Sequence, residues 1–212
     1  NYTVPYNIEV VYRWDAAQSY SSLSEVQLVP VEFDAVQPMM AALRDVWFKP
    51  YIQATGNSLD FLKEVAPKKI VLVGSPEYQN GSFKLGQAEG GRKILLLNVN
   101  NFDASNENEL KEALHTIVHE FTHILHQTKL FNQEYQTIST GRYNSNWTLL
   151  NDSEARHQGF ITNYAMLNKD EDFAEMVSGI LVFGYEWFKD TVLAEAAKST
   201  ENPHAKADLE AK

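Results

Sequence analysis

The strongest constraint on the fold of this chain is a long stretch with helical periodicity that begins near Asn106. Asn106 and Glu109 have the spacing of an N-terminal capping box, although Asn is an imperfect fit to it. At about 100° per residue, the apolar side chains of the stretch fall on one side of a helix. These side chains are Leu110, Ala113, Leu114, Ile117, Phe121, Ile124 and Leu125. The pattern predicts a helix that packs on a core through one face.

Four of the six histidines lie on the opposite side of this helix, at positions 115, 119, 123 and 126. His119 and His123 are one helical turn apart, so both imidazoles could reach one zinc ion at roughly 2.0–2.1 Å. Glu120 is rotated toward the flank of that face, where its carboxylate can reach a water molecule without ligating the metal. This H-E-x-x-H pattern predicts a zinc site with Glu120 as general base. The alternative is a solvated, histidine-rich helix surface.

A third protein ligand is expected, because a catalytic zinc site usually has three. In metzincins it is a histidine at the position held here by Lys129, which excludes that class. The chain has no cysteine, so any metal must be held by His, Asp or Glu, and the alternative to a metzincin histidine is a carboxylate from a second helix. The downstream candidates are Glu134, Asp152, Glu154, Glu171, Asp172 and Glu175.

Residues 170–190 predict a second long helix, on which Glu171 and Glu175 share a face. Glu171 could ligate zinc, and Glu175 could accept a hydrogen bond from the other ring nitrogen of a ligand histidine. The small residues Ser178 and Gly179 on that face would allow close approach to the histidine helix. The alternative is an acidic first turn, which the helix dipole favours.

His119, Glu120 and His123, followed by a glutamate on a later helix, resemble the gluzincin class of zinc peptidases. Residues 162–175 also resemble a stretch of the zinc protease domain of anthrax lethal factor. There a tyrosine precedes the ligand glutamate by seven residues, an asparagine falls between them, and the sequence FAE closes the run. The corresponding positions here are Tyr164, Asn168, Glu171 and residues 173–175.

This resemblance implies one role for each residue of the second stretch. Glu171 would be the third zinc ligand, Tyr164 would donate a hydrogen bond to the oxyanion, and Glu175 would support a ligand from the second shell. Asp172 departs from the family pattern, which has an apolar residue there, so Asp172 stays open as an alternative ligand, although spacing favours Glu171. We also predict that His115, on the face of the ligands, lies beside them in the second shell.

The layout of the whole chain resembles a family of zinc-binding metallopeptidases from Bacteroidetes. These are small envelope lipoproteins, often encoded beside TonB-dependent nutrient importers. The resemblance implies one zinc ion, a location in the cell envelope as an outer-membrane lipoprotein or in the periplasm, and association with such an importer. It leaves two functions open: a zinc metallopeptidase, and a catalytically silent zinc-binding accessory module of an uptake system.

The order of elements, with strands and a helix first and only helices later, predicts an α+β fold. By the resemblance it would be zincin-like, with a small N-terminal mixed sheet, the active-site helix and a helical C-terminal lobe. We expect one catalytic domain over residues 1–200, with lobes at about 1–130 and 131–200. Residues 131–150 are predicted as a surface loop, and residues 201–212 as a solvated tail.

The expected partner is a peptide or protein substrate. Residues 93–99 predict a strand directly before the histidine helix, after a hairpin turn at Gly90 and Gly91. An extended peptide could add to the edge of that strand. Nucleic acid is not expected, because 28 acidic and 18 basic residues give a net charge of −10.

Overall fold

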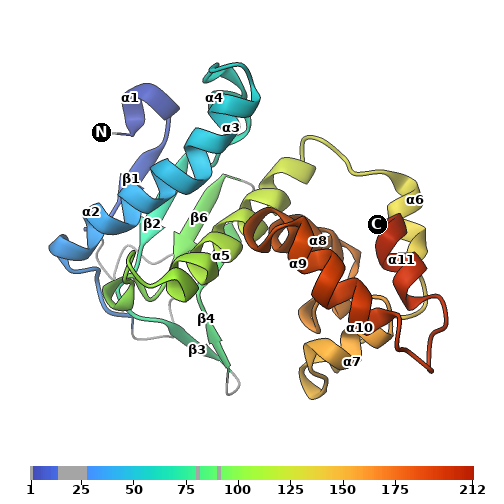
Figure 1. Cartoon of the computed structure of the whole chain (residues 1–212). Helices are drawn as coiled ribbons and strands as arrows, with labels where there is room; N and C mark the ends of the chain where they lie inside the picture. The colour runs from blue at the N-terminus through green and yellow to red at the C-terminus, as the bar shows by residue number, and fades with distance from the viewer. Residues whose placement is uncertain (1, 14–27, 80–81, 90–91) are drawn as a thin grey trace. The chain divides into compact units, whose positions relative to one another are not determined.

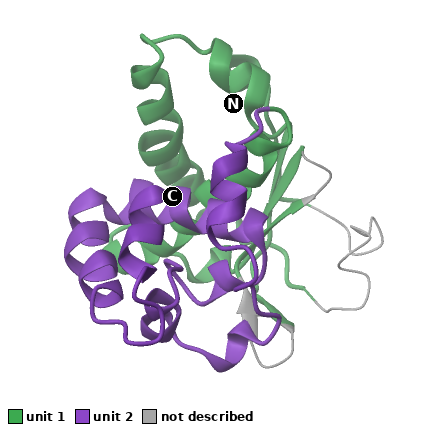
Figure 2. Cartoon of the chain, turned by 90° about the vertical axis from the view of Figure 1, so that its right-hand side faces the viewer, with its two compact units in different colours: residues 1–128 green, residues 129–212 purple. Residues whose placement is uncertain are grey.

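The computed structural model describes residues 2–13, 28–79, 82–89 and 92–212. The chain divides into two compact units, residues 1–128 and residues 129–212, which Figure 2 shows in green and purple. The predicted lobe boundary, at about residue 130, lies close to this division. Within the described residues, no helix is both long enough and apolar enough to cross a membrane.

The described residues of the first unit form a four-stranded mixed sheet with the order β1–β2–β6–β5. Its strands are β1 (Glu9–Val11), β2 (Lys69–Leu72), β5 (Gly86–Glu89) and β6 (Lys93–Leu96). The strands β1, β2 and β6 are parallel, and β5 runs antiparallel to β6. A separate antiparallel pair consists of β3 (Glu77–Gln79) and β4 (Ser82–Lys84).

The predicted strand at residues 93–99 forms as β6 but is shorter, since a 3-10 turn, η2 (Val99–Asn101), follows it. It is also an inner strand, because β2 and β5 occupy its two edges. An extended peptide therefore cannot add to β6, and the expected pairing along residues 93–99 is corrected. Among the described strands, β5 is the edge on that side of the sheet. The predicted turn at Gly90 and Gly91 lies outside the described residues.

Both faces of the central strands are covered. In β2, the side chains of Ile70 and Leu72 are buried on one face, while Val71 belongs to a cluster on the other face with Leu95 of β6. Burial on both sides explains why these strands are continuous apolar runs without alternation. The long helices α2 (Phe33–Ala42) and α5 lie over the same face of the sheet (Figure 1).

The N-terminal helical segment continues past Pro50. After α2 the chain continues as a π-helix, η1 (Leu43–Phe48), and then as α3 (Lys49–Ala54). Proline lacks an N–H group and its ring crowds the preceding turn of a helix. The wider turn of a π-helix before Pro50 can accommodate the ring, so that the helix continues. The described part of this unit also contains two short helices, α1 (Thr3–Tyr6) and α4 (Asp60–Val65).

The predicted histidine helix forms as α5 (Glu107–His126). Asn106 caps it, because its side chain accepts hydrogen bonds from the N–H groups of Asn108 and Glu109. The apolar face packs on the preceding helices, where the ring of Phe121 meets the ring of Trp47 edge-on at 5.3 Å between centroids. The core of the unit therefore fixes the rotation of α5 about its axis.

Gly86 of β5 allows this edge strand to approach α5. A Cβ atom at position 86 would collide with the Cγ2 atom of Thr116 and would lie 3.7 Å from the Cγ atom of Glu120. We expect Gly86→Ala to destabilise the protein by about 1–3 kcal/mol, because overpacking must push the strand and helix apart.

Urea unfolding of Gly86→Ala tests this expectation, with the double variant Gly86→Ala/Thr116→Ala as the matched control. Removing the Thr116 methyl group makes room for the new Cβ atom, so the double variant should regain most of the lost free energy of unfolding. A Gly86→Ala variant as stable as the parent would contradict the close approach of β5 and α5.

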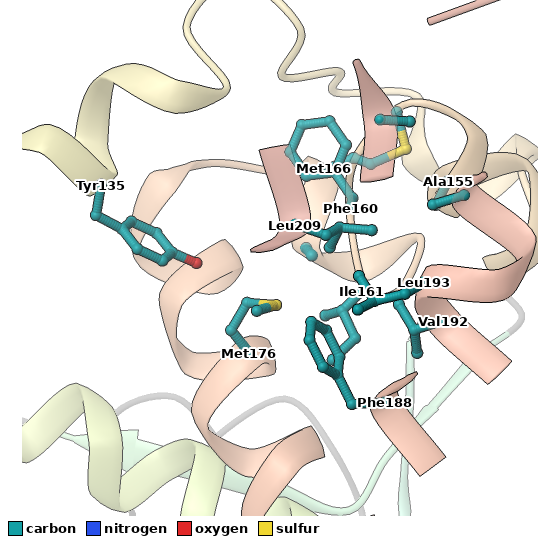
Figure 3. Packing of buried hydrophobic residues seen from close by; sticks show 13 residues of the cluster. Tyr135, Ala155, Phe160, Ile161, Met166, Met176, Phe188, Val192, Leu193 and Leu209 are labelled. Carbon is teal, nitrogen blue, oxygen red and sulfur yellow. The ribbon is translucent and has the colours of Figure 1, made fainter. Parts of the chain in front are cut away.

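The second unit is helical in its described residues, and its core is drawn in Figure 3. Its helices are α6 (Gln133–Ile138), α7 (Asp152–His157), α8 (Lys169–Phe183), α9 (Tyr185–Trp187), η5 (Phe188–Leu193), α10 (Ala194–Ala196) and α11 (Ala205–Ala211). The short 3-10 turns η3 (Trp147–Leu149) and η4 (Tyr164–Met166) lie between them. With the sheet of the first unit, this arrangement confirms the predicted α+β class.

Three predictions for the second unit differ from the structure. The predicted loop at 131–150 contains α6, which buries Tyr135. The predicted helix at 170–190 breaks at Gly184, whose φ of 89° with ψ of 158° lies in a region that only glycine adopts readily. The predicted solvated tail is the helix α11, and its residues Ala205 and Leu209 belong to the core of the unit.

Candidate metal centre

The two histidines of the H-E-x-x-H pattern converge on each other. The Nε2 atoms of His119 and His123 are 3.0 Å apart, and their ring planes cross at 78°. Two nitrogens that share one tetrahedral zinc ion at 2.0–2.1 Å would be about 3.3 Å apart. The pair therefore fits one ion, and the same two atoms can share a proton as a hydrogen bond when no ion is bound.

The environment of these histidines differs from that of a solvated surface. His119 is buried, with 6% of its surface exposed, and His123 is half-buried. Val118 and Thr122, next to them in the sequence, are also buried. A burial of this kind on the polar side of an amphipathic helix favours the metal-site interpretation over the histidine-rich surface.

Glu120 points to the edge strand of the sheet. Its Oε2 atom accepts a hydrogen bond of 2.6 Å from the main-chain N–H group of Ala88 in β5. The position of Glu120 on the flank of the histidine face, expected from the helix geometry, is consistent with this contact. Sequence reasoning did not identify Ala88, because its contribution is a main-chain group and any residue except proline would supply it.

His115 and His126 continue the row of histidines along α5. The ring of His115 lies 6.3 Å from that of His119, and the ring of His126 lies 5.7 Å from that of His123, measured between centroids. These distances make them neighbours of the pair. The second-shell role of His115 stays a prediction.

In the second unit, Glu171 lies in the first turn of α8. Asn168 caps this turn, because its Oδ1 atom accepts hydrogen bonds from the N–H groups of Asp170 at 2.8 Å and Glu171 at 3.1 Å. The cap explains why the asparagine between the tyrosine and the glutamate matters for structure: it fixes the backbone at the predicted ligand. Glu171 itself is half-buried.

Asp172, the alternative ligand, is engaged elsewhere. Its side chain is fully buried, and both of its carboxylate oxygens bind the Nζ atom of Lys212, at 2.8 Å and 2.6 Å. Burial raises the pKa of the Asp172 carboxyl group, and the nearby Lys212 and Tyr143 act against that rise. A carboxylate committed to an ion pair is a poor candidate for zinc, so the structure favours Glu171 over Asp172.

Glu175, the predicted second-shell residue, is buried and held from the loop before α8. Its Oε2 atom accepts a hydrogen bond of 2.7 Å from the hydroxyl group of Thr162, which in turn accepts one from the N–H group of Ala165. Thr162 was missed by sequence reasoning. The only available signal was its place at the start of the stretch that resembles lethal factor, where no role was assigned to it.

Tyr164, the predicted oxyanion donor, lies in the short turn η4 between α7 and α8. Its ring packs edge-on against the ring of Trp147, with centroids 4.9 Å apart. The turn is close to α8 in sequence, because only Leu167 separates its last residue, Met166, from the N-cap residue Asn168. The catalytic role of Tyr164 stays a prediction.

The small residues on α8 serve the interior of the second unit. A Cβ atom on Gly179 would lie 2.9 Å from the Cδ1 atom of Ile161, and the Ser178 hydroxyl donates to the carbonyl oxygen of Ala174 at 2.7 Å. These contacts account for Ser178 and Gly179 without the predicted approach to the histidine helix.

The predicted ligands His119, His123 and Glu171 are of residue types that bind zinc ions. Two imidazoles and a carboxylate are a donor set of catalytic zinc sites, and the chain has no thiolate to offer. The first two residues belong to the first unit and the third belongs to the second unit.

Comparisons with known proteins support this chemistry at the level of the family. A sequence model described as "putative zinc-binding metallo-peptidase" matches residues 1–212. The crystal structure of a putative zinc-binding metallo-peptidase from Bacteroides caccae is similar, with a TM-score of 0.76 and 32% identity over 100% of this chain and 77% of that chain. No curated protein matches significantly. Because the family match spans its whole length, the chain belongs to the family of putative zinc-binding metallo-peptidases.

Proposed function

We propose that this chain is a zinc-dependent peptidase in which His119, His123 and Glu171 hold one zinc ion and Glu120 is the general base. The observation that carries the proposal is the pair of imidazole Nε2 atoms, 3.0 Å apart on α5, together with the Glu120 carboxylate that the N–H group of Ala88 holds. A bound zinc ion would polarise a peptide carbonyl group and lower the pKa of a water molecule. The family supports a peptidase, and the residue roles are our proposal.

Glu120 would transfer protons during hydrolysis. The N–H group of Ala88 holds one carboxylate oxygen, which fixes the orientation of the group and leaves the second oxygen to take a proton from the attacking water. The same carboxyl group would then protonate the leaving amine. The Tyr164 hydroxyl would donate a hydrogen bond to the oxyanion, as the resemblance to lethal factor implies.

We propose that the substrate is an extended peptide that adds to β5, in place of β6. The N–H group of Leu97 donates to the carbonyl oxygen of Leu85, so antiparallel alternation turns the main-chain groups of Gly86 and Ala88 away from β6. The N–H group of Ala88 binds Glu120, which confirms this orientation. The outward groups of Gly86 and the carbonyl of Ala88 would pair with the peptide.

The experiment that tests the function combines metal analysis with a peptide digest. We expect about one zinc ion per chain in the purified protein. A mixture of unstructured peptides should acquire new ends, detected by mass spectrometry. A chelator such as 1,10-phenanthroline should stop the cleavage, and added zinc should restore it.

Two results would contradict the proposal in different ways. Absence of zinc after reconstitution would refute the metal site. One bound zinc ion without cleavage of any peptide would refute the peptidase and favour the accessory module that binds zinc without turnover.

A further inference from the structure

A buried ion pair lies beside the proposed metal ligand. The side chains of Asp172 and Lys212 both have 0% exposure. The Lys212 ammonium group has three N–H donors, and it contacts three acceptors: Oδ1 of Asp172 at 2.8 Å, Oδ2 of Asp172 at 2.6 Å and the carbonyl oxygen of Gly159 at 2.9 Å. The ring of Phe160 covers the ammonium group, with its centroid 4.4 Å from Nζ. The cation is therefore fully satisfied without water.

A contribution to stability does not by itself explain why this ion pair is present. Removing two charges from water costs free energy that their attraction often fails to recover, and apolar side chains of similar size are often as stabilising. A fully buried ion pair at this place therefore points to a need to hold the first turn of α8 in a fixed orientation.

The pair is joined directly to the first turn of α8. Asp172 directly follows Glu171 in the sequence. The next residue, Phe173, stacks its ring on that of Phe131, with 4.3 Å between the centroids. Asn168 holds the backbone of the same turn through the N–H group of Glu171. The turn is thus anchored by its cap, by the charge of Asp172 and by the Phe173 ring, and these anchors lie on both sides of Glu171, the proposed zinc ligand, in the sequence.

We propose that the Asp172–Lys212 pair positions Glu171 for zinc binding, so that the helix α11 fixes the geometry of the metal centre. Lys212 and Asp172 are positioning residues and do not touch the ion. The inference rests on the proposed function, because it takes Glu171 as a zinc ligand. It assigns to α11 a role in the geometry of the metal centre.

The test compares Lys212→Met with a matched control, Arg156→Met. Arg156 is also a buried cation of the second unit, but its partners lie outside α8. They are Glu195 at 2.8 Å, the carbonyl oxygen of Ile161 at 3.1 Å, Asp152 at 3.8 Å and the ring of Trp187. Both variants should lower the melting temperature. Only Lys212→Met should weaken zinc binding, by about 10- to 100-fold, the usual effect of losing a group that orients a ligand.

A second readout does not depend on bound zinc. In the metal-free protein, amide hydrogen exchange of residues 169–174 should be faster in Lys212→Met than in Arg156→Met and the parent, because the first turn of α8 loses its anchor. Lys206→Met serves as the control for charge, since it removes an exposed lysine from the same helix, where Lys206 pairs with Glu210. It should change neither zinc affinity nor exchange.

If Lys212→Met does not fold, zinc affinity is measured on the variant Tyr143→Phe in its place. This change removes only the hydroxyl group that donates to Oδ2 of Asp172 at 3.3 Å, and it should weaken zinc binding by less than Lys212→Met would. Zinc affinity equal to the parent in the folded variants would refute the positioning role alone. A parent that binds no zinc would refute the proposed function and the positioning role together.

Discussion

Replacement of Glu120 by glutamine is expected to lower peptide hydrolysis by at least about 10²- to 10⁴-fold, the usual contribution of a positioned general base. Glutamine has the same shape, and its carbonyl oxygen can still accept the hydrogen bond from the N–H group of Ala88. It cannot take a proton from water. Zinc content and stability should therefore remain at the level of the parent while turnover is lost.

The measurement is the initial rate of cleavage of one peptide found in the digest, together with zinc content by elemental analysis. Glu112→Gln is the matched control, because Glu112 is an exposed glutamate on the same helix, two turns before Glu120. It should retain the activity of the parent. Equal turnover in Glu120→Gln and the parent would refute the general-base role and require another group to accept the proton.

The histidine helix could be predicted because its information is local. Apolar residues recur with the helical period, so the core face of α5 follows from the sequence, and the spacing of His119 and His123 then places both rings on one side. The structure adds that their Nε2 atoms lie 3.0 Å apart. The cap at Asn168 is equally local, and it fixes the start of α8 close to the predicted position.

The sheet was less predictable, because strand order depends on pairing between distant segments. Residues 93–96 are a strand as expected, but nothing in that run indicates that β5 covers its edge. The contact between Glu120 and Ala88 follows from this pairing. It also depends on Gly86, whose missing side chain lets β5 approach α5.

The end of the described chain shows how composition can mislead. Residues 201–212 are charged and rich in alanine, which is typical of a solvated segment, yet Ala205 and Leu209 of α11 belong to the core of the second unit. Lys212 forms an ion pair with Asp172, which lies forty residues away in the sequence, and no periodic pattern in the sequence predicts such a pair. Long-range ion pairs of this kind can be found only from the fold.

Replacement of His119 by alanine is expected to abolish zinc binding at practical concentrations, with an affinity loss of more than about 100-fold, since loss of an orienting group alone costs 10- to 100-fold. The remaining imidazole of His123 and one carboxylate would bind zinc weakly. Because zinc stabilises only a folded state that binds it, added zinc should raise the melting temperature of the parent and leave that of the variant unchanged.

His126→Ala provides the matched control for the histidine helix. Its ring lies on the same face, 5.7 Å from that of His123, but it is not part of the H-E-x-x-H pattern, so the variant should keep the zinc content of the parent. Elemental analysis and thermal unfolding with and without zinc separate the two variants. Equal zinc content in His119→Ala and the parent would remove His119 from the ligand set, and the close pair of Nε2 atoms would then be a hydrogen bond within a histidine-rich helix.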